Sequence, residues 1–287
     1  MKLPDNNGCF RMRPYLFTFY ILLLSFSLFA QDDRPVRLRY ESYSIGLGTD
    51  NVYDSYLSPL KYKGLNVGLL CEKMKMLDGK DGNFSFQRQY FVDLSQTQNR
   101  TETASNLTLF AEGDYAVFYR FNLNEKFQLF AGPQAGILIG GIYNNRNQNN
   151  PMSVKMNLNL GLSGIAAYKL MLKSQPVRFR YQANLPAVGV LFAPQFGQSY
   201  YFLSDNENTF FASSFHNHLT FKNILSVELP LNRITIRATY VNSFYQTKIN
   251  NLLTQCYSNT FYVGISKNFY TVKAGKKDNK NHSTIFK

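Results

Sequence analysis

A repeated alternation of apolar and polar residues is the feature of this chain that most restricts its fold. In the stretch VKMNLNLGL, from Val154 to Leu162, every second residue is apolar and each residue between is polar or glycine. A period of two places successive side chains on opposite faces of an extended strand. Such a strand fits either a water-soluble sandwich, with the leucines inside, or a membrane barrel, with the leucines in lipid.

The same alternation recurs along most of the chain and predicts ten long strands. They are expected at residues 36–47, 65–77, 83–97, 106–121, 126–142, 154–172, 177–188, 218–229, 233–247 and 257–270. Strands of soluble proteins usually have about five to six residues, whereas a tilted membrane strand needs about nine to eleven. The lengths therefore favour a membrane barrel.

The connections between these segments support the same interpretation. Numbered from the N-terminus, the odd gaps are long, as in GTDNVYDSYLSPLKYKG, and the even gaps are short, as in PLN. Bacterial outer-membrane barrels have long outer loops and short periplasmic turns. We therefore predict an all-β, antiparallel up-and-down transmembrane β-barrel of about ten strands, in the bacterial outer membrane, with both termini periplasmic. Eight or twelve strands stay open, because the long region Gly189–Asn217 could hide a hairpin.

The N-terminus indicates export. Met12 and Arg13 precede an apolar stretch that ends at Phe29, and Ala30 is followed by polar sequence. A basic start, a short apolar segment and a small residue form the pattern of a secretory signal peptide. We expect a signal peptide at 1–30, a barrel at 31–272 and a basic, disordered periplasmic tail at 273–287.

The formal net charge of +13 bears on the partners of the chain. Nucleic acid is not expected for an exported protein, whereas contact with outer-membrane lipid is, and the phosphates of lipopolysaccharide are a further candidate. Scattered solubilising lysines and a basic tail are the alternative explanation of the charge. We also expect contact with the barrel-insertion machinery during biogenesis, and a monomer as the final state.

In a barrel of this kind the polar face of each strand lines the interior, where unpaired charges are costly. We expect the acidic side chains on this face to pair with the arginines and to form a network that fills the lumen. The predicted lumen network consists of Glu112, Asp114, Arg120, Lys155, Arg178, Arg180, Lys222, Glu228, Arg233 and Arg237.

Three segments resemble a known family. They are YSIGLGTDNVYDSYLSPLKYKG (Tyr43–Gly64), FAPQFGQSYYF (Phe192–Phe202) and SFHNHLTFKN (Ser214–Asn223). They are similar to segments of an uncharacterised family of Bacteroidetes exported β-proteins, known only as a domain of unknown function. The resemblance implies outer-membrane localisation and supplies no catalytic residues. The segment TFYVGISKNF resembles the terminal strand that barrel-insertion machinery reads.

Few residues offer catalytic or metal chemistry. His216 lies beside serines and an asparagine in the segment SSFHN, and outer-membrane hydrolases include enzymes that use a serine and a histidine. A polar cap on a strand is the simpler interpretation. The neighbouring His-Asn-His trio lacks a nearby carboxylate or thiol, so we expect no metal and no cofactor. Cys71 and Cys256 could pair in an oxidising periplasm, but at least one strand should separate them, and we favour two unpaired thiols.

These observations lead to three functional hypotheses. The first is a non-enzymatic outer-membrane barrel whose extracellular loops, especially Gly189–Asn217, serve envelope integrity, adhesion or ligand contact. The second is a lipid- or lipopolysaccharide-modifying hydrolase that uses His216. The third is a narrow diffusion pore.

Overall fold

The computed structural model describes residues 37–77, 82–124, 126–172, 175–193, 209–231, 234–271 and 285. The signal peptide predicted at 1–30 lies outside these residues. The described segments form the strands β1 (Arg37–Asp54), β2 (Lys61–Met76), β3 (Phe84–Asn99), β4 (Ser105–Asn122), β5 (Phe127–Asn144), β6 (Met152–Leu172), β7 (Gln175–Phe192), β8 (Phe210–Ser214), β9 (His218–Pro230), β10 (Thr235–Ile249) and β11 (Leu252–Thr271). In these residues no helix is long and apolar enough to cross a membrane.

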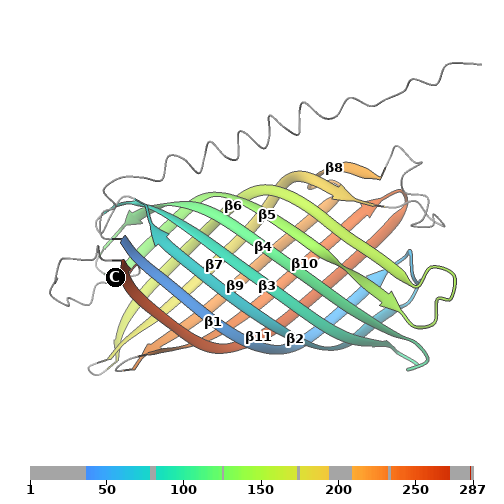
Figure 1. The fold of residues 1–287 in the computed structure, drawn as a ribbon, viewed down its shortest axis with the longest axis horizontal. Helices are drawn as coiled ribbons and strands as arrows, with labels where there is room; N and C mark the ends of the chain where they lie inside the picture. The colour runs from blue at the N-terminus through green and yellow to red at the C-terminus, as the bar shows by residue number, and fades with distance from the viewer. Residues whose placement is uncertain are drawn as a thin grey trace, which may run out of the picture. The chain divides into compact units, whose positions relative to one another are not determined.

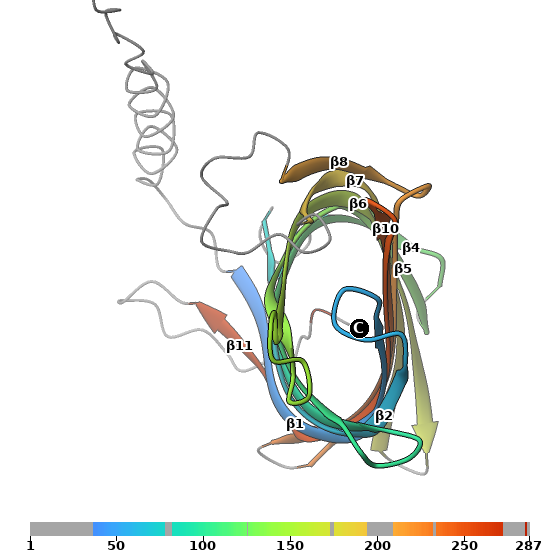
Figure 2. The same ribbon diagram turned by 90° about the vertical axis from the view of Figure 1, so that its right-hand side faces the viewer.

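Ten of these strands close into an antiparallel barrel, which Figures 1 and 2 show from the side and towards one end. Strand β1 pairs with β11 along its whole length, and β6 pairs with β7, so the sheet forms a ring. The prediction of a ten-stranded, all-β antiparallel barrel is confirmed. A closed ring satisfies the backbone hydrogen bonds of its strands without leaving an open sheet edge.

Strand β8 is an addition to the ring, in the region that was expected to be a long loop. Strand β7 runs on to Phe192 and pairs there with β8, whereas β9 pairs with β7 only as far as Asn184. Pro186 follows closely and has no N–H to continue the ladder, which is a physical reason for the separation of β9 from β7 at this point. The remainder of the expected loop, residues 194–208, lies outside the described residues.

Several strands are longer than the alternation predicted. The expected first loop shrinks to residues 55–60, and the expected last loop shrinks to Asn250 and Asn251. Both asparagines have positive φ, 52° and 58°, as in the tight turn that favours asparagine between two strands. The strands continue past the apolar band, where outward residues such as Lys63 are polar and the alternation is lost. The predicted contrast between long odd gaps and short even gaps therefore fails at the last gap, and the even gap at residues 77–83 is longer than the odd gaps at residues 55–60 and 100–104.

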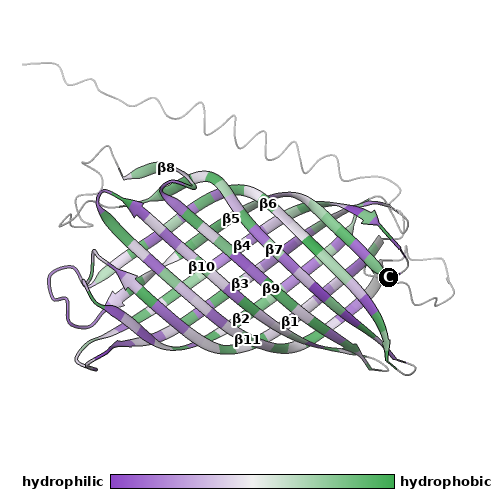
Figure 3. Ribbon diagram, turned by 180° about the vertical axis from the view of Figure 1, so that it is seen from behind, coloured by the Kyte–Doolittle hydropathy of each residue, from purple (hydrophilic) through white to green (hydrophobic). Residues whose placement is uncertain are grey.

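The two faces of the barrel wall have opposite polarity. Leu158, Leu160 and Leu162 are 59%, 60% and 64% exposed on the outside, while Lys155 and Asn157 are buried inside. Figure 3 shows the same alternation of hydrophobic and hydrophilic residues along the strands. An apolar exterior around a polar interior is the reverse of a soluble core and is the arrangement of membrane barrels.

Two glycines on the inner face make room for a tyrosine side chain that lies along the inside of the barrel wall. A Cβ atom on Gly46 would lie 2.5 Å from the ring of Tyr262, and one on Gly68 would lie 2.4 Å from its hydroxyl. The hydroxyl of Tyr262 donates a hydrogen bond to Asp93 Oδ1 at 2.9 Å. The glycines thus allow an aromatic side chain to lie flat over β1 and β2 and reach β3.

The cysteines of the described residues are free. Cys71 on β2 lies opposite Tyr43 of β1, and Cys256 on β11 lies opposite Val52 of β1. Strand β1 separates them, and Tyr43 and Val52 are far apart along it, since a strand rises by about 3.3 Å per residue. A disulfide requires Cα atoms within about 7 Å, so these two residues cannot bridge.

Candidate functional site: the filled lumen

The lumen holds a carboxylate between two arginines from strands that do not pair with the strand that carries it. Glu72 on β2 forms ion pairs with Arg180 on β7 and Arg237 on β10, each with an N–O distance of 2.6 Å. Gln87 Nε2 also donates to Glu72 Oε1 at 2.5 Å. All three charged side chains are at most 4% exposed. Buried charges of this kind are stable only when they are paired and further hydrogen-bonded.

A second carboxylate, Glu228, is linked to Arg237 through a tyrosine. Arg237 Nη1 donates to the hydroxyl of Tyr40 at 2.9 Å, and the hydroxyl of Tyr40 donates to Glu228. Arg178 Nη1 lies 3.7 Å from Glu228 Oε2. Arg237 also donates to Ser226 at 2.9 Å. The cluster thus ties β1, β2, β7, β9 and β10 together across the lumen.

Two lysines make further ion pairs inside the barrel. Lys222 on β9 contacts Glu112 on β4, and its Nζ lies 3.6 Å from Asp114 Oδ2. Lys155 on β6 lies 2.8 Å from Asp54 Oδ2 at the end of β1. Each pair again joins strands that are distant in the ring, so the interior charges act as cross-braces.

Apolar side chains fill the lumen where charges do not. One cluster lies at the end where β1 begins and β11 ends. It includes Ile285 from the predicted tail, which is fully buried. The other residues beyond Thr271 lie outside the described residues. The members of this cluster are Leu38, Tyr40, Met74, Met76, Ala116, Phe118, Phe130, Ile165, Ala167 and Ile285. Leu70, Phe91, Ile224, Val241 and Tyr262 form a second cluster, and Val52, Tyr56, Leu57 and Ile142 form a third at the opposite end. The described part of the lumen is therefore packed along its length.

The structure places the predicted lumen residues as follows. Glu112, Asp114, Lys155, Arg178, Arg180, Lys222, Glu228 and Arg237 take part in the interior ion pairs described above. Arg120 is buried and donates to the carbonyl of Gly82 at 2.8 Å. Arg233 lies outside the described residues. Of the predicted acidic residues, Glu228 has an arginine partner, whereas Glu112 and Asp114 contact a lysine.

Sequence reasoning missed the acidic residue at the centre of the network. Glu72 lies in the run LLCEKMKM, where cationic residues on the outer face and methionines on the inner face obscure which face is polar. Continuing the inner face from Asn66 by steps of two would have reached it. Asp54 was missed for a different reason, because the strand that carries it was expected to have ended.

The histidine considered for catalysis lies in the exposed turn between β8 and β9. Its Nδ1 contacts the hydroxyl of Ser214. The side chain of Asn217 accepts from the backbone N–H of Ser214 at 2.8 Å and donates to the carbonyl of Ala212 at 2.9 Å. The asparagine therefore closes the turn and does not orient His216 as the third member of a catalytic triad would. Within the described chain, no group of three or more His, Cys, Asp or Glu residues could hold a metal.

The ring of ten antiparallel strands, apolar outside and filled by side chains inside, defines the class of closed β-barrels. Within that class, the chain belongs to the family described as "Protein of unknown function (DUF3316)", whose model matches residues 16–277. The resemblance to a domain family of unknown function is thus confirmed, while the bacterial group that it named stays a prediction. A comparison with curated proteins finds no match.

Solved structures with similar architecture are membrane-associated barrels with little sequence identity. They include the transport unit of the autotransporter AIDA-I from Escherichia coli, with 12% identity over 88% of this chain and 97% of that chain and a TM-score of 0.44. The translocator domain of NalP from Neisseria meningitidis has 10% identity over 88% and 95%, with a TM-score of 0.38. The COG4313 outer membrane channel from Pseudomonas putida F1 has 9% identity over 83% and 97%, with a TM-score of 0.36. TM-scores below 0.5 give no basis for transferring a function.

Proposed function

We propose that this protein is a non-enzymatic outer-membrane β-barrel that does not conduct, and that it holds a rigid polar rim at the outer surface for ligand contact, adhesion or envelope integrity. The observation that carries the proposal is the lumen, which is filled by cross-braced charges and apolar clusters inside a wall with an apolar exterior. A barrel that transported solutes by diffusion would need an open interior.

The polar rim lies at the end of the barrel opposite the start of β1 and the end of β11. Hydrogen bonds between the loops that connect the strands hold this rim together. Arg146 Nη1 donates to Thr103 at 3.2 Å, and Asn147 Nδ2 donates to the carbonyl of Leu57 at 3.2 Å. These bonds join the β5–β6 connection to the β3–β4 and β1–β2 connections. Asn144 adds a donor bond to Tyr62 at 3.0 Å. A surface ordered before binding loses less entropy when a partner docks, which favours a contact role.

The test combines location, orientation and conductance. The folded barrel should migrate differently from the heated chain on a gel, and a protease site inserted after Gln148 in the rim should be cleaved on intact cells. A site placed after Lys287 should be cleaved only after the outer membrane is opened. Cleavage of the second site alone on intact cells would refute the orientation, and absence of the barrel from the outer-membrane fraction would refute the location.

Conductance separates this proposal from the diffusion pore. Planar bilayers that contain the inserted barrel should stay silent, because the apolar cluster with Phe118 and Phe130 blocks one end of the lumen. Their rings meet edge to face with centroids 6.5 Å apart. Stepwise currents from correctly inserted wild-type protein would overturn the closed-barrel proposal.

The contact between Ser214 and His216 is the one observation that favours the hydrolase. Mass spectrometry of lipid A from cells that carry wild type or His216→Ala separates the two functions. Our proposal expects identical lipid A profiles. A modified species that disappears only in His216→Ala would support the hydrolase instead.

A further inference from the structure

A groove lies on the outer face of the barrel where the neighbouring strands β11, β1 and β2 approach the polar rim. It has a volume of about 340 Å³, and the outward side chains that line it are Asn51, Tyr53, Lys61, Lys63, Gln255 and Tyr257. The alternation along each strand points these side chains away from the lumen, because the intervening residues Val52, Tyr62 and Thr254 are buried inside. Ligand pockets usually have volumes of about 300–1,000 Å³, so the groove is large enough for a small ligand or a headgroup.

Two lysines give the groove its charge. Lys61 and Lys63 lie two residues apart on β2 and are exposed. Their cross-strand neighbours on β1 are Tyr53 and Asn51, and Lys63 lies opposite Gln98 of β3, so no carboxylate stands directly opposite either lysine. Among the described residues, which include the β1–β2, β3–β4 and β10–β11 connections beside the groove, neither lysine forms an ion pair. The groove therefore presents two ammonium groups to its occupant.

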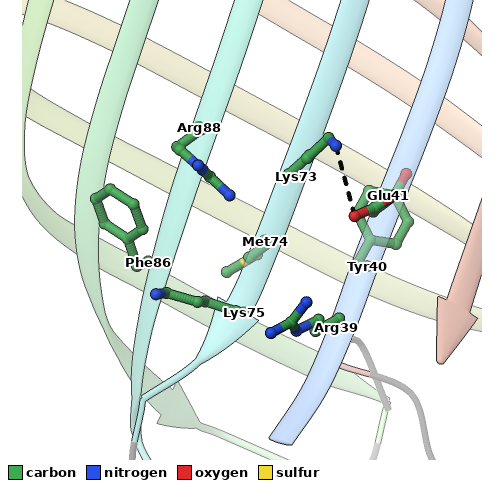
Figure 4. Close-up of a pocket in the computed structure, with 8 residues that line it drawn as sticks. All are labelled: Arg39, Tyr40, Glu41, Lys73, Met74, Lys75, Phe86 and Arg88. Carbon is green, nitrogen blue, oxygen red and sulfur yellow. Dashed lines mark ion pairs between the residues drawn. The ribbon is translucent and has the colours of Figure 1, made fainter. Parts of the chain in front are cut away.

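The other end of the same outer face shows how the sheet balances an outward lysine. Lys73 on β2 lies directly opposite Glu41 on β1, and its Nζ is 3.7 Å from Glu41 Oε1 (Figure 4). Opposite charges at paired positions stabilise a sheet. Lys61 and Lys63 have neutral partners at the corresponding positions, so strand pairing does not account for their charges. An anionic ligand would account for them.

Side chains of β10 hold two other members of the groove in place. The rings of Tyr257 and Phe244 have centroids 4.7 Å apart, and Gln255 Nε2 donates to Gln246 Oε1 at 2.8 Å. A tyrosine offers an apolar ring with a polar hydroxyl, and an amide offers donors and an acceptor. Sugars present apolar C–H faces and hydroxyl groups, which match these two kinds of side chain. Together with the two ammonium groups, this set of side chains fits a phosphorylated sugar.

The wall next to the groove indicates that the ligand carries hydrocarbon. Further from the rim on the same three strands, the outward residues Leu47, Leu65 and Phe261 are 69%, 72% and 54% exposed. Leu65 follows Lys63 at the next outward position of β2, and Leu47 lies opposite Phe261. Tyrosines at the border of an apolar belt mark the level of lipid headgroups. A phosphorylated sugar held at this level, with hydrocarbon along the belt, is the headgroup of a glycolipid.

We propose that this groove binds the phosphorylated sugar headgroup of lipid A, the lipid part of lipopolysaccharide, with a phosphate between Lys61 and Lys63 and the acyl chains along the belt at Leu47, Leu65 and Phe261. The inference rests on the proposed function, which places the polar rim at the outer surface, where the facing leaflet contains lipopolysaccharide. Phosphate oxygens accept hydrogen bonds from ammonium groups. The groove holds the barrel at a defined depth in that leaflet and gives the rim one ligand class.

The chain offers a matched control on the same strand. Lys73 and Lys75 also lie two residues apart on the outer face of β2, at its other end. The groove variant Lys61→Gln/Lys63→Gln and the control Lys73→Gln/Lys75→Gln therefore remove the same two charges by the same substitutions. Heat-dependent gel mobility of each refolded full chain verifies that the barrel has folded before lipid is added. Gel filtration in detergent micelles over a range of lipid concentrations, with mass spectrometry of the retained lipid, then gives the affinity.

We expect wild type to bind lipid A more tightly than phosphatidylglycerol, which carries a phosphate without a sugar. Each removed charge should weaken the binding of lipid A about fivefold, so the groove variant should lose about thirtyfold and the control less than twofold. Lipid A stripped of its phosphates should bind wild type and the groove variant equally. Equal affinity of wild type for lipid A and phosphatidylglycerol, or an equal loss in both variants, would overturn the proposal.

Two further arms keep the test decisive. If the groove variant does not fold, wild type in 1 M salt replaces it, because screening should weaken the binding of lipid A but not of its dephosphorylated form; binding of lipid A that is unchanged by salt contradicts the proposal. The micelle assay does not depend on the orientation of the barrel in the cell. Failure of the protease to cut the rim site on intact cells refutes the proposed orientation, whereas binding of lipid A that does not depend on Lys61 and Lys63 refutes only the groove.

Discussion

Replacing Glu72 by glutamine should destabilise the barrel strongly, although the two side chains have nearly the same shape. Glu72 Oε1 lies 2.6 Å from Arg180 Nη1 in an ion pair and accepts a hydrogen bond from Gln87 at 2.5 Å, and Oε2 accepts a hydrogen bond from Arg237 at 2.6 Å. Glutamine has an NH₂ group in place of one of the two carboxylate oxygens. Since both oxygens face N–H groups, the NH₂ group would point at an N–H donor in either orientation of the amide. The side chain at position 72 would then offer the two buried guanidinium groups one neutral oxygen in place of two charged ones.

The expected cost follows from the loss of a partner for a buried charge. Removing one member of a buried ion pair destabilises a protein by about 3–5 kcal/mol. With a urea slope of about 2 kcal/mol/M, the unfolding midpoint should fall by about 2 M. The assay is urea unfolding of the barrel in detergent micelles, followed by the gel mobility of folded and unfolded chains.

Two comparisons test the reasoning behind this number. Glu102→Gln makes the same chemical change in an exposed connection and should shift the free energy of unfolding by less than about 0.5 kcal/mol. The triple variant Glu72→Met/Arg180→Met/Arg237→Met removes all three charges and should regain most of the loss, because apolar residues can replace a buried ionic cluster. A midpoint for Glu72→Gln within 0.25 M of wild type, or about 0.5 kcal/mol at that slope, would refute the view that these charges brace the lumen.

Three further predictions concern the wall of the barrel. Leu160→Arg should cost about 2–4 kcal/mol in lipid, with Leu160→Ala as the control for size; equal unfolding free energies would show that this face does not meet hydrocarbon. Asn251→Val should destabilise the β10–β11 turn by about 1–3 kcal/mol, since φ is 58° there, while Asn251→Gly should be nearly neutral, and the same urea assay measures both. Non-reducing gels of the purified barrel should show no disulfide between Cys71 and Cys256, and a band that shifts on reduction would contradict the β1 register.

Local alternation was sufficient to predict most of the wall. In VKMNLNLGL the polar and apolar residues separate between lumen and exterior as the period of two requires, and the same holds for Arg178 and Arg180. The strand ends were harder to predict, because the chain stays extended beyond the apolar band. There the outward residues, such as Lys61 and Lys63, become polar, while apolar residues such as Val52 lie inside, so the alternation no longer has an apolar outer face and a polar inner face.

Which side chains contact each other depends on the closure of the barrel and on the register of its strands. Neither can be deduced from a local sequence pattern. Glu72 meets Arg237 only because the sheet curls into a ring, although the two residues are 165 positions apart. Arg39 and Lys75 face each other because β1 and β2 pair in one particular register. The sequence by itself determined which side chains face inward and outward. Only the tertiary structure decided which charges lie within reach of each other, because that distance is set by strand pairing across the whole barrel.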